Sequence, residues 1–219
     1  MCWNEKVSLS AFAIGTAANI YIATTYKHPM ILATCVLWEF VLLMQIFEAG
    51  AWITHKKNVA KNNLNCSKEN TFFAKGAYIA NVCQPIVLAI VVLALNNSNI
   101  SQENKLLGGG IIMIYIGWLL YATNKIDEVK CLRPSNECSN LVYEWWSKFP
   151  LGAAIYMITL VGLIIVLVRP MNFALMQLSY ILLTFAVSAY FYKCGIGSVW
   201  CYLAAAAPLL IKPMWDASQ

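Results

Sequence analysis

Apolar runs close to 20 residues long recur along the whole chain, and each is bounded by charged or Asn-rich residues. A helix of about 20 apolar residues is long enough to cross the hydrocarbon core of a bilayer. The runs occupy approximately residues 7–26, 30–54, 72–95, 106–122, 151–168, 173–192 and 196–211. The sequence therefore predicts an all-α fold, in which residues 1–219 form a single bundle of seven transmembrane helices.

The composition is that of a polytopic membrane protein. Hydrophobic residues make up 60% of the chain and charged residues 11%, whereas soluble globular domains average about 25% charged residues. The first run is long enough to span and lacks a small-residue cleavage pattern after it, so we expect a retained span rather than a signal peptide. The expected partner is the lipid bilayer and not nucleic acid, and the sequence leaves the oligomeric state open.

Basic residues divide unevenly between the two sides that seven spans define. Of the 15 Lys and Arg residues, eleven fall on the N-terminal side, and the other four are Lys27, Lys105, Arg169 and Lys212. Cytoplasmic loops carry the excess of Lys and Arg. The division therefore predicts a cytoplasmic N-terminus and a C-terminus on the opposite side.

Cysteines gather on the same side as the basic residues, where we expect a disulfide or thiol cluster. Its members are Cys2, Cys66, Cys131, Cys138 and Cys194. In an oxidising compartment Cys131 would pair with Cys138 and Cys66 with Cys194, whereas in the cytosol the five would be thiols or metal ligands. Cysteine and charge thus favour opposite orientations, and we give charge the greater weight.

The second run carries polar groups where hydrocarbon is expected. Gln45, Glu48 and Trp52 share one helix face at i, i+3 and i+7, and Glu39 points to the other side. Ionisable groups inside a membrane usually face the bundle interior and mark a functional site. We therefore expect Glu48 to be buried and hydrogen-bonded to groups from runs three and seven, and Glu39 to find a partner elsewhere.

Polar positions of three runs fall in one half of the membrane when helical rise is used to place them. Asn81 lies roughly 4 Å and Cys201 roughly 3 Å from the midplane on the N-terminal side, and Glu48 roughly 9 Å. This convergence predicts a polar cavity. Its candidate binding residues are Gln45, Glu48, Trp52, Asn81, Gln84, Ser198, Trp200 and Cys201. A purely structural polar cluster is the alternative reading.

Three further local features carry expectations. Pro85 should kink the third run unless neighbours satisfy the freed carbonyl. The Gly- or Ala-rich runs at 106–122 and 196–211 should be closely packed helices, because small residues let backbones approach. The aromatic segment 143–146 reads as an interfacial belt at the membrane surface.

Four short segments, in order along the chain, resemble an uncharacterised family of bacterial multi-span membrane proteins that begin MCFSATASF. Here residues 1–9 read MCWNEKVSL, and the family motifs QQFxEGxxW, HVLWP and SVWCFF are similar to MQIFEAGAW (44–52), NVCQP (81–85) and SVWCY (198–202). The family His is Asn81 here, which argues against a metal, so we expect none. The chain also looks like seven-span proteins of large algal viruses. The resemblance implies a membrane fold and supports the site's position, but it supplies no reaction, and any cofactor is unknown.

Three functions fit these observations. The first is a seven-helix protein that binds or transports a small molecule or ion around Glu48, in a cavity open toward the N-terminal side. The second is a membrane-embedded enzyme with Cys2 or Cys201 as nucleophile or ligand and Glu48 as base. The third is a structural membrane protein, such as one of a virus particle. The sequence favours a non-enzyme and does not identify the ligand.

Overall fold

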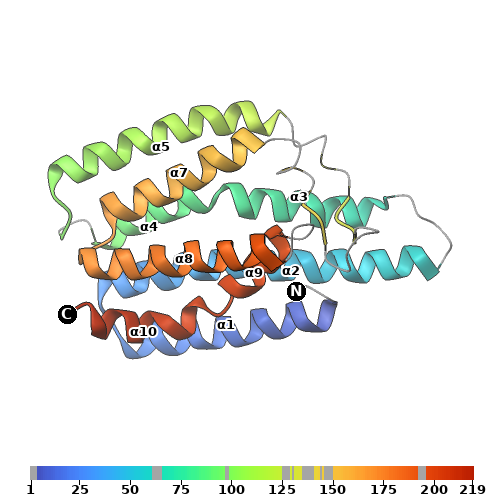
Figure 1. Cartoon of the computed structure of the whole chain (residues 1–219), viewed down its shortest axis with the longest axis horizontal. Coiled ribbons are helices and arrows are strands. Elements are labelled where there is room, and N and C mark those ends of the chain that lie inside the picture. Colours follow the sequence, from blue (N-terminus) through green and yellow to red (C-terminus); the bar gives the residue numbers. More distant parts are fainter. Residues whose placement is uncertain are drawn as a thin grey trace.

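The structure is a computed structural model, and its described residues form a bundle of helices (Figure 1). It describes residues 4–60, 66–96, 99–124, 129, 131–134, 141–143, 145, 150–191 and 196–219. The helices are α1 (Glu5–Thr25), α2 (Pro29–Ala60), α3 (Lys68–Val82), α4 (Gln84–Asn96), α5 (Gln102–Thr123), α7 (Pro150–Leu167), α8 (Met171–Phe191), α9 (Ile196–Ala204) and α10 (Ala207–Ala217).

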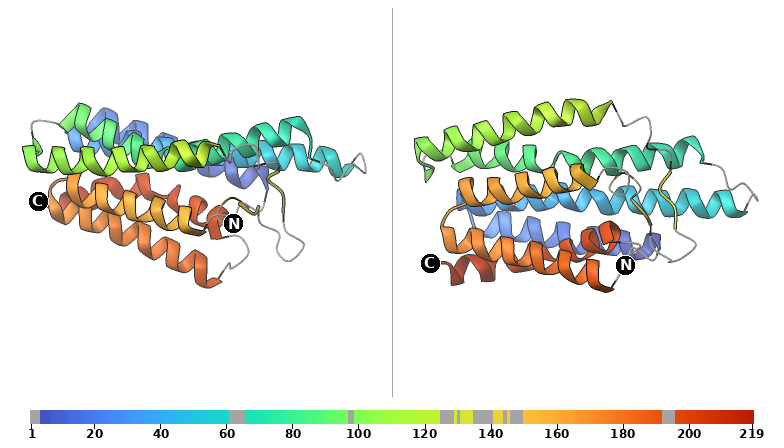
Figure 2. Two further views of the ribbon diagram at one scale, coloured as in Figure 1. Left: turned by 90° about the horizontal axis from the view of Figure 1, so that it is seen from above. Right: turned by 45° about the horizontal axis from the view of Figure 1, so that its top comes forward.

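The helices lie in two layers. Seen from above, α1 to α5 form one layer and α7 to α10 the other (Figure 2). The layers join where α5 packs on α7, α4 on α7, and α1 and α2 on α10. The start of α1 and the end of α10 lie at opposite ends of the bundle (Figure 1).

Helix α2 is the central element. It contacts α1, α3, α4, α9 and α10, and its 32 residues correspond to a length of about 48 Å. A bilayer core is only about 30 Å thick, so the end of α2 that carries Lys56 and Lys57 extends beyond the hydrocarbon. There the exposed Lys56 ammonium pairs with Glu5 at 2.6 Å, which aligns the start of α1 with the end of α2.

Local sequence explains where several helices begin. The side chains of Asn4, Ser67 and Ser101 accept hydrogen bonds from backbone N–H groups three residues later, and so cap α1, α3 and α5. Helices α2 and α7 begin at Pro29 and Pro150, whose fixed φ suits the first turn.

Four of the described helices, α1, α2, α5 and α8, are long and apolar enough to cross a membrane. The pairs α3–α4 and α9–α10 are bent by 49° and 56°, and they raise the number to six if each pair is one broken span. The protein is thus all-helical with four to six candidate spans among the described residues. The expected span at 151–168 folds as the shorter apolar helix α7, so the seven-span count is not confirmed.

The small-residue runs differ from each other in packing. In the most apolar stretch of α5 only 22% of the residues are buried. A Cβ atom added at Gly109, Gly110 or Gly117 would have no other atom within 4 Å. At Gly108, however, a Cβ would lie 2.7 Å from the Leu167 side chain of α7. The expectation that 106–122 is closely packed therefore holds for the face toward α7 and fails for the outer face. In the α9–α10 pair the expectation holds, since a Cβ on Gly15 of α1 would lie 2.9 Å from the Ala205 carbonyl oxygen.

Helices α2 and α3 interlock through two glycines. A Cβ at Gly50 would lie 2.3 Å from the Phe73 ring, and one at Gly76 would lie 2.3 Å from the Phe47 ring. Each helix therefore offers a phenyl ring to the glycine of the other. This close approach brings the polar face of α2 against α3, next to the site.

Candidate functional site

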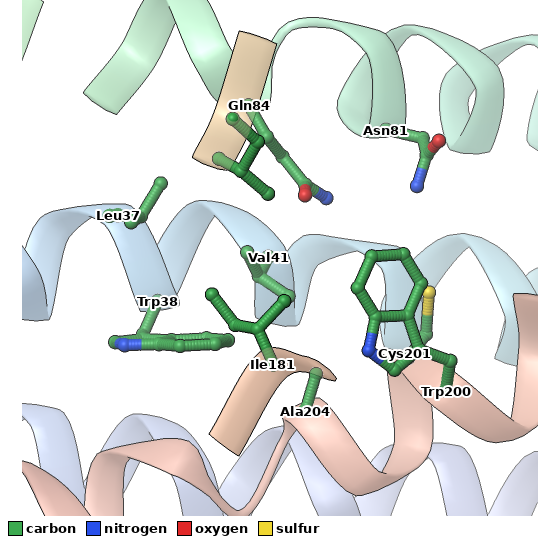
Figure 3. A pocket seen from close by; sticks show the side chains of 10 residues that line it. Leu37, Trp38, Val41, Asn81, Gln84, Ile181, Trp200, Cys201 and Ala204 are labelled. Atoms are coloured by element: carbon green, nitrogen blue, oxygen red, sulfur yellow. The ribbon is translucent and has the colours of Figure 1, made fainter. Parts of the chain in front are cut away.

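A small cavity lies between α2, the α3–α4 pair, α7, α8 and α9 (Figure 3). Its volume is about 20 Å³. The lining residues are Leu37, Trp38, Val41, Asn81, Gln84, Leu160, Ile181, Trp200, Cys201 and Ala204. A space of roughly 10–15 Å³ holds one water molecule, so this cavity admits a water-sized or monatomic occupant.

The first helix break lies on one side of this cavity. Helix α3 ends at Val82, Cys83 forms a turn, and α4 starts at Gln84 with Pro85 in its first turn. Proline lacks the N–H that a continuous helix needs, which explains the 49° bend. The Tyr115 hydroxyl of α5 donates to the Val82 carbonyl at 2.7 Å, so a neighbouring helix satisfies the backbone at the break. The predicted kink at Pro85 is present.

The second break lies across the cavity and repeats this design. Helix α9 ends at Ala204, and α10 begins at Ala207 with Pro208 in its first turn. The Tyr180 hydroxyl of α8 donates to the Leu203 carbonyl at 2.6 Å. Each break thus combines a proline with a tyrosine from a neighbouring helix, and the cavity lies between the two breaks.

Two carboxamides from the first break face the cavity. The side chains of Asn81 and Gln84 point from α3 and α4 toward the residues of α9 (Figure 3). Gln84 Oε1 accepts a hydrogen bond from the buried Tyr156 hydroxyl. Asn81 is 2% exposed, and its Oδ1 has no hydrogen-bond partner among the described residues. A buried carbonyl oxygen without a donor costs about 1–3 kcal/mol, so it is suited to a bound water or cation.

Glu48 lies beside this cavity and is fully buried. The Tyr143 hydroxyl donates a hydrogen bond to Glu48 Oε1. The same hydroxyl is within hydrogen-bonding reach of the Cys201 thiol, and Glu48 lies close enough to Cys201 for an electrostatic interaction. Because Cys201 also lines the cavity, Tyr143 and Cys201 connect the carboxyl group to it.

The residues predicted for the site lie in and around this region. Asn81, Gln84, Trp200 and Cys201 line the cavity. The others are buried without lining it: Gln45, Glu48 and Ser198 are 0% exposed, and Trp52 is 6% exposed. Glu39 points the other way, as expected, and contacts α1.

Sequence reasoning missed the tyrosines that organise the site: Tyr115, Tyr143 and Tyr156. Tyr143 and Trp145 are 5% and 4% exposed and stack with their ring centroids 4.6 Å apart. The interfacial-belt interpretation is therefore wrong for these two residues, which insert into the bundle against Tyr78 and Gly197. Glu144 and Trp146 lie outside the described residues.

A disulfide holds this inserted segment to α3. Cys66 bonds Cys131, so the expected pairs Cys131–Cys138 and Cys66–Cys194 do not form. The reason is Asn70, whose side chain exchanges two hydrogen bonds with the backbone of Leu132, at 2.9 and 3.0 Å, and so brings Cys131 to the start of α3. Cys2, Cys138 and Cys194 lie outside the described residues.

The described residues offer no metal site built from His, Cys, Asp and Glu side chains. Among them, no group of three or more His, Cys, Asp or Glu residues could hold a metal ion. His28 packs on Trp215 and His55 on Trp52, near opposite ends of α2.

Comparison with known proteins adds no relative. No family model, no curated protein and no solved structure matches this chain.

Proposed function

We propose that this integral membrane protein binds and transports a small monovalent cation in the cavity between its two helix breaks, with the buried Glu48 carboxyl group close by. The observation that carries the proposal is that the two breaks meet at one cavity, whose otherwise apolar wall carries the carboxamides of Asn81 and Gln84. Discontinuous helices that meet inside the membrane form the ion sites of many secondary transporters. The alternating motion in such proteins rocks one group of helices against another, and the two layers here offer such groups.

The size of the cavity supports an ion rather than a larger molecule. Ligand pockets for small organic molecules usually measure about 300–1,000 Å³, far above the 20 Å³ found here. Oxygen atoms are the natural ligands of hard cations. Asn81 Oδ1 is the oxygen that lacks a donor, and Gln84 Oε1 still has a second lone pair.

Thermal unfolding of the purified protein in detergent tests the binding step. We expect sodium, lithium or potassium chloride to raise the unfolding midpoint above that in choline chloride. A cation at ten times its Kd stabilises the folded state by about 1.4 kcal/mol. Asn81→Leu should remove this effect, because it replaces the amide oxygen by methyl groups. Proteoliposomes loaded with a cation-sensitive dye should then show flux that Asn81→Leu abolishes.

A matched control separates the site from general destabilisation. Thr34→Val removes a buried hydroxyl that bonds only its own helix, at the Met30 carbonyl, so it should retain the cation effect. A midpoint that is the same in every salt, together with an absence of flux, would overturn the proposal. The polar groups would then be a structural cluster that fixes helix register, as in a structural membrane protein.

A membrane-embedded enzyme is the second candidate. It is favoured by Tyr143, whose hydroxyl lies between the Glu48 carboxyl and the Cys201 thiol. In that function Cys201 would be the nucleophile and Glu48 the base. Alkylation with iodoacetamide tests it: a Cys201 that reacts faster than Cys35, another buried cysteine, would favour the enzyme.

The topology is part of the proposal. We propose seven spans, with the N-terminus cytoplasmic on the strength of the eleven-to-four division of basic residues. The Cys66–Cys131 bond argues for the reverse orientation, because disulfides persist in oxidising compartments. Protease protection of tags at both ends decides between them, and tags on the same side would exclude seven spans.

We also propose that the chain belongs to the bacterial family whose members begin MCFSATASF.

A further inference from the structure

Glu39, the second carboxylate of α2, has polar neighbours of its own on the face of the helix opposite to Glu48. Glu39 accepts two hydrogen bonds from α1: the Thr16 hydroxyl donates to Oε1 at 2.7 Å, and the Asn19 amide donates to Oε2 at 2.9 Å. Glu39 and Glu48 are nine residues apart, so their side chains leave α2 on opposite faces. This site is therefore separate from the cavity.

Nothing in the described residues neutralises the charge of Glu39. Its partners Thr16 and Asn19 are neutral, and the ion pairs among these residues join Lys56 to Glu5 and Lys212 to Asp216. Among the described residues, the Cys35 thiol on the preceding turn of α2 is a titratable group that interacts electrostatically with Glu39. A carboxylate at membrane depth is costly without a compensating positive charge, and a proton is the smallest one available.

Both partners of Glu39 can serve either protonation state. A hydroxyl and a carboxamide each donate and accept hydrogen bonds. With an ionised Glu39 both partners donate, and the Asn19 Oδ1, in a residue only 3% exposed, then has no partner among the described residues. Turning the Asn19 amide by 180° brings this oxygen to face Glu39, where it accepts a hydrogen bond from a protonated carboxyl. Only the carboxamide oxygen and nitrogen exchange places, and the backbone of α1 need not move.

The site is open on its outer side, and that side is apolar. Glu39 is partly exposed, unlike Glu48. On the same face one turn earlier Val36 is 46% exposed, and on α1 Ile20, one residue after Asn19, is 59% exposed. Exposed aliphatic side chains at this depth face lipid, so the open edge of the carboxyl adjoins the hydrocarbon.

We propose that Glu39, Thr16 and Asn19 form a reversible proton-binding site that faces the lipid at the α1–α2 seam. A proton given up by hydronium at the membrane surface adds to a carboxylate oxygen, the water formed stays in the aqueous phase, and the Asn19 amide turns to accept the new O–H. Release runs the same steps backward. The site is independent of the cation cavity, so a failure of one proposal leaves the other standing.

Carbodiimide labelling of the intact protein in liposomes tests this. Dicyclohexylcarbodiimide is apolar and adds the O–H of a protonated carboxylic acid across its C=N bond. We expect peptide mass spectrometry to find the adduct on Glu39, with a yield that rises as the pH is lowered. Glu39→Gln should lose the adduct. Thr16→Val with Asn19→Leu should raise the yield at neutral pH, because the anion loses both donors.

Reagent polarity gives the matched control. A water-soluble carbodiimide should label Glu103, an exposed carboxyl at the start of α5, and leave Glu39 unlabelled. Labelling of Glu39 by the water-soluble reagent would overturn the lipid-facing site. An absence of the apolar adduct at every pH, or a yield that does not change with pH, would overturn proton binding.

Discussion

The Tyr143 hydroxyl donates a hydrogen bond to the carboxyl group of Glu48, which lies 95 residues earlier in the chain and is fully buried. The segment between α5 and α7 therefore reaches into the bundle instead of lying over it. Its anchors are the Cys66–Cys131 bond and the Asn70 side chain. Through this segment the region outside the spans is directly connected to the polar interior.

Tyr143→Phe should destabilise the protein by about 1–3 kcal/mol, because a buried carboxyl group loses a hydrogen-bond donor while the ring contacts remain. Tyr143→Ala should cost more, since it also leaves a cavity beside Trp145 and Gly197. The measurement is the midpoint of thermal unfolding in detergent, followed by circular dichroism.

Tyr121→Phe is the control for this change. Its hydroxyl is on a residue that is 63% exposed on α5, so the midpoint should not move. Equal midpoints for Tyr143→Phe and the wild type would show that the bond to Glu48 contributes nothing to stability.

The disulfide should be recovered as a Cys66–Cys131 cross-link when unreduced protein is digested and mapped by mass spectrometry. The bond closes a loop with a sequence separation of 65, so replacing both cysteines by Ser should cost about 4 kcal/mol by the chain-entropy estimate. Recovery of Cys131 linked to Cys138 would instead restore the pairing expected from their short spacing. Whether this disulfide is intact in native membranes also bears on which side of the membrane the loop faces, because a disulfide in the cytosol would be reduced.

Apolar length and period were enough to locate the helices. Each of the seven predicted runs coincides with a described helix or bent pair, because a long apolar segment satisfies its backbone hydrogen bonds within itself when it folds as a helix. The kink at Pro85 was also readable, since proline acts locally. The second break, at Pro208, was not predicted, although the same local signal is present.

Contacts between distant segments could not be read in this way. An aromatic segment such as 143–146 has the same composition whether it lies at the membrane interface or inserts into the bundle. Whether the segment inserts depends on Asn70 and Cys66, which bind Leu132 and Cys131, more than 60 positions later in the chain. Depth along each helix did bring Asn81 and Cys201 to one cavity. The rotation of α5 and α7, which carry Tyr115 and Tyr156, could not be read from depth, and Tyr143 comes from the segment between these helices.

The two helix breaks should each depend on a tyrosine hydroxyl. Tyr115→Phe removes the donor to the Val82 carbonyl, and Tyr180→Phe removes the donor to the Leu203 carbonyl. Tyr115→Phe leaves the Val82 carbonyl without a donor and should cost about 1–3 kcal/mol. Tyr180→Phe should cost less, about 0.5–1.5 kcal/mol, because the Leu203 carbonyl keeps a hydrogen bond from the Ala206 N–H at 3.1 Å. Tyr190→Phe, on a residue that is 75% exposed, should be neutral in the same unfolding assay. If all three variants unfold alike, the hydroxyls do not support the breaks.

The interlocked glycines of α2 and α3 give the sharpest packing test. Gly50→Ala and Gly76→Ala each insert a methyl group 2.3 Å from a phenyl ring, so each should destabilise by about 1–3 kcal/mol through overpacking. Gly117→Ala adds the same methyl group where no atom lies within 4 Å, and it should be neutral or stabilising by up to about 1 kcal/mol, because alanine restricts the unfolded chain. Shortening the facing ring with Phe47→Leu should recover part of the loss in Gly76→Ala but none of the loss in Gly50→Ala, whose partner is Phe73. A rescue of both variants by Phe47→Leu would contradict the pairing of each glycine with its own ring.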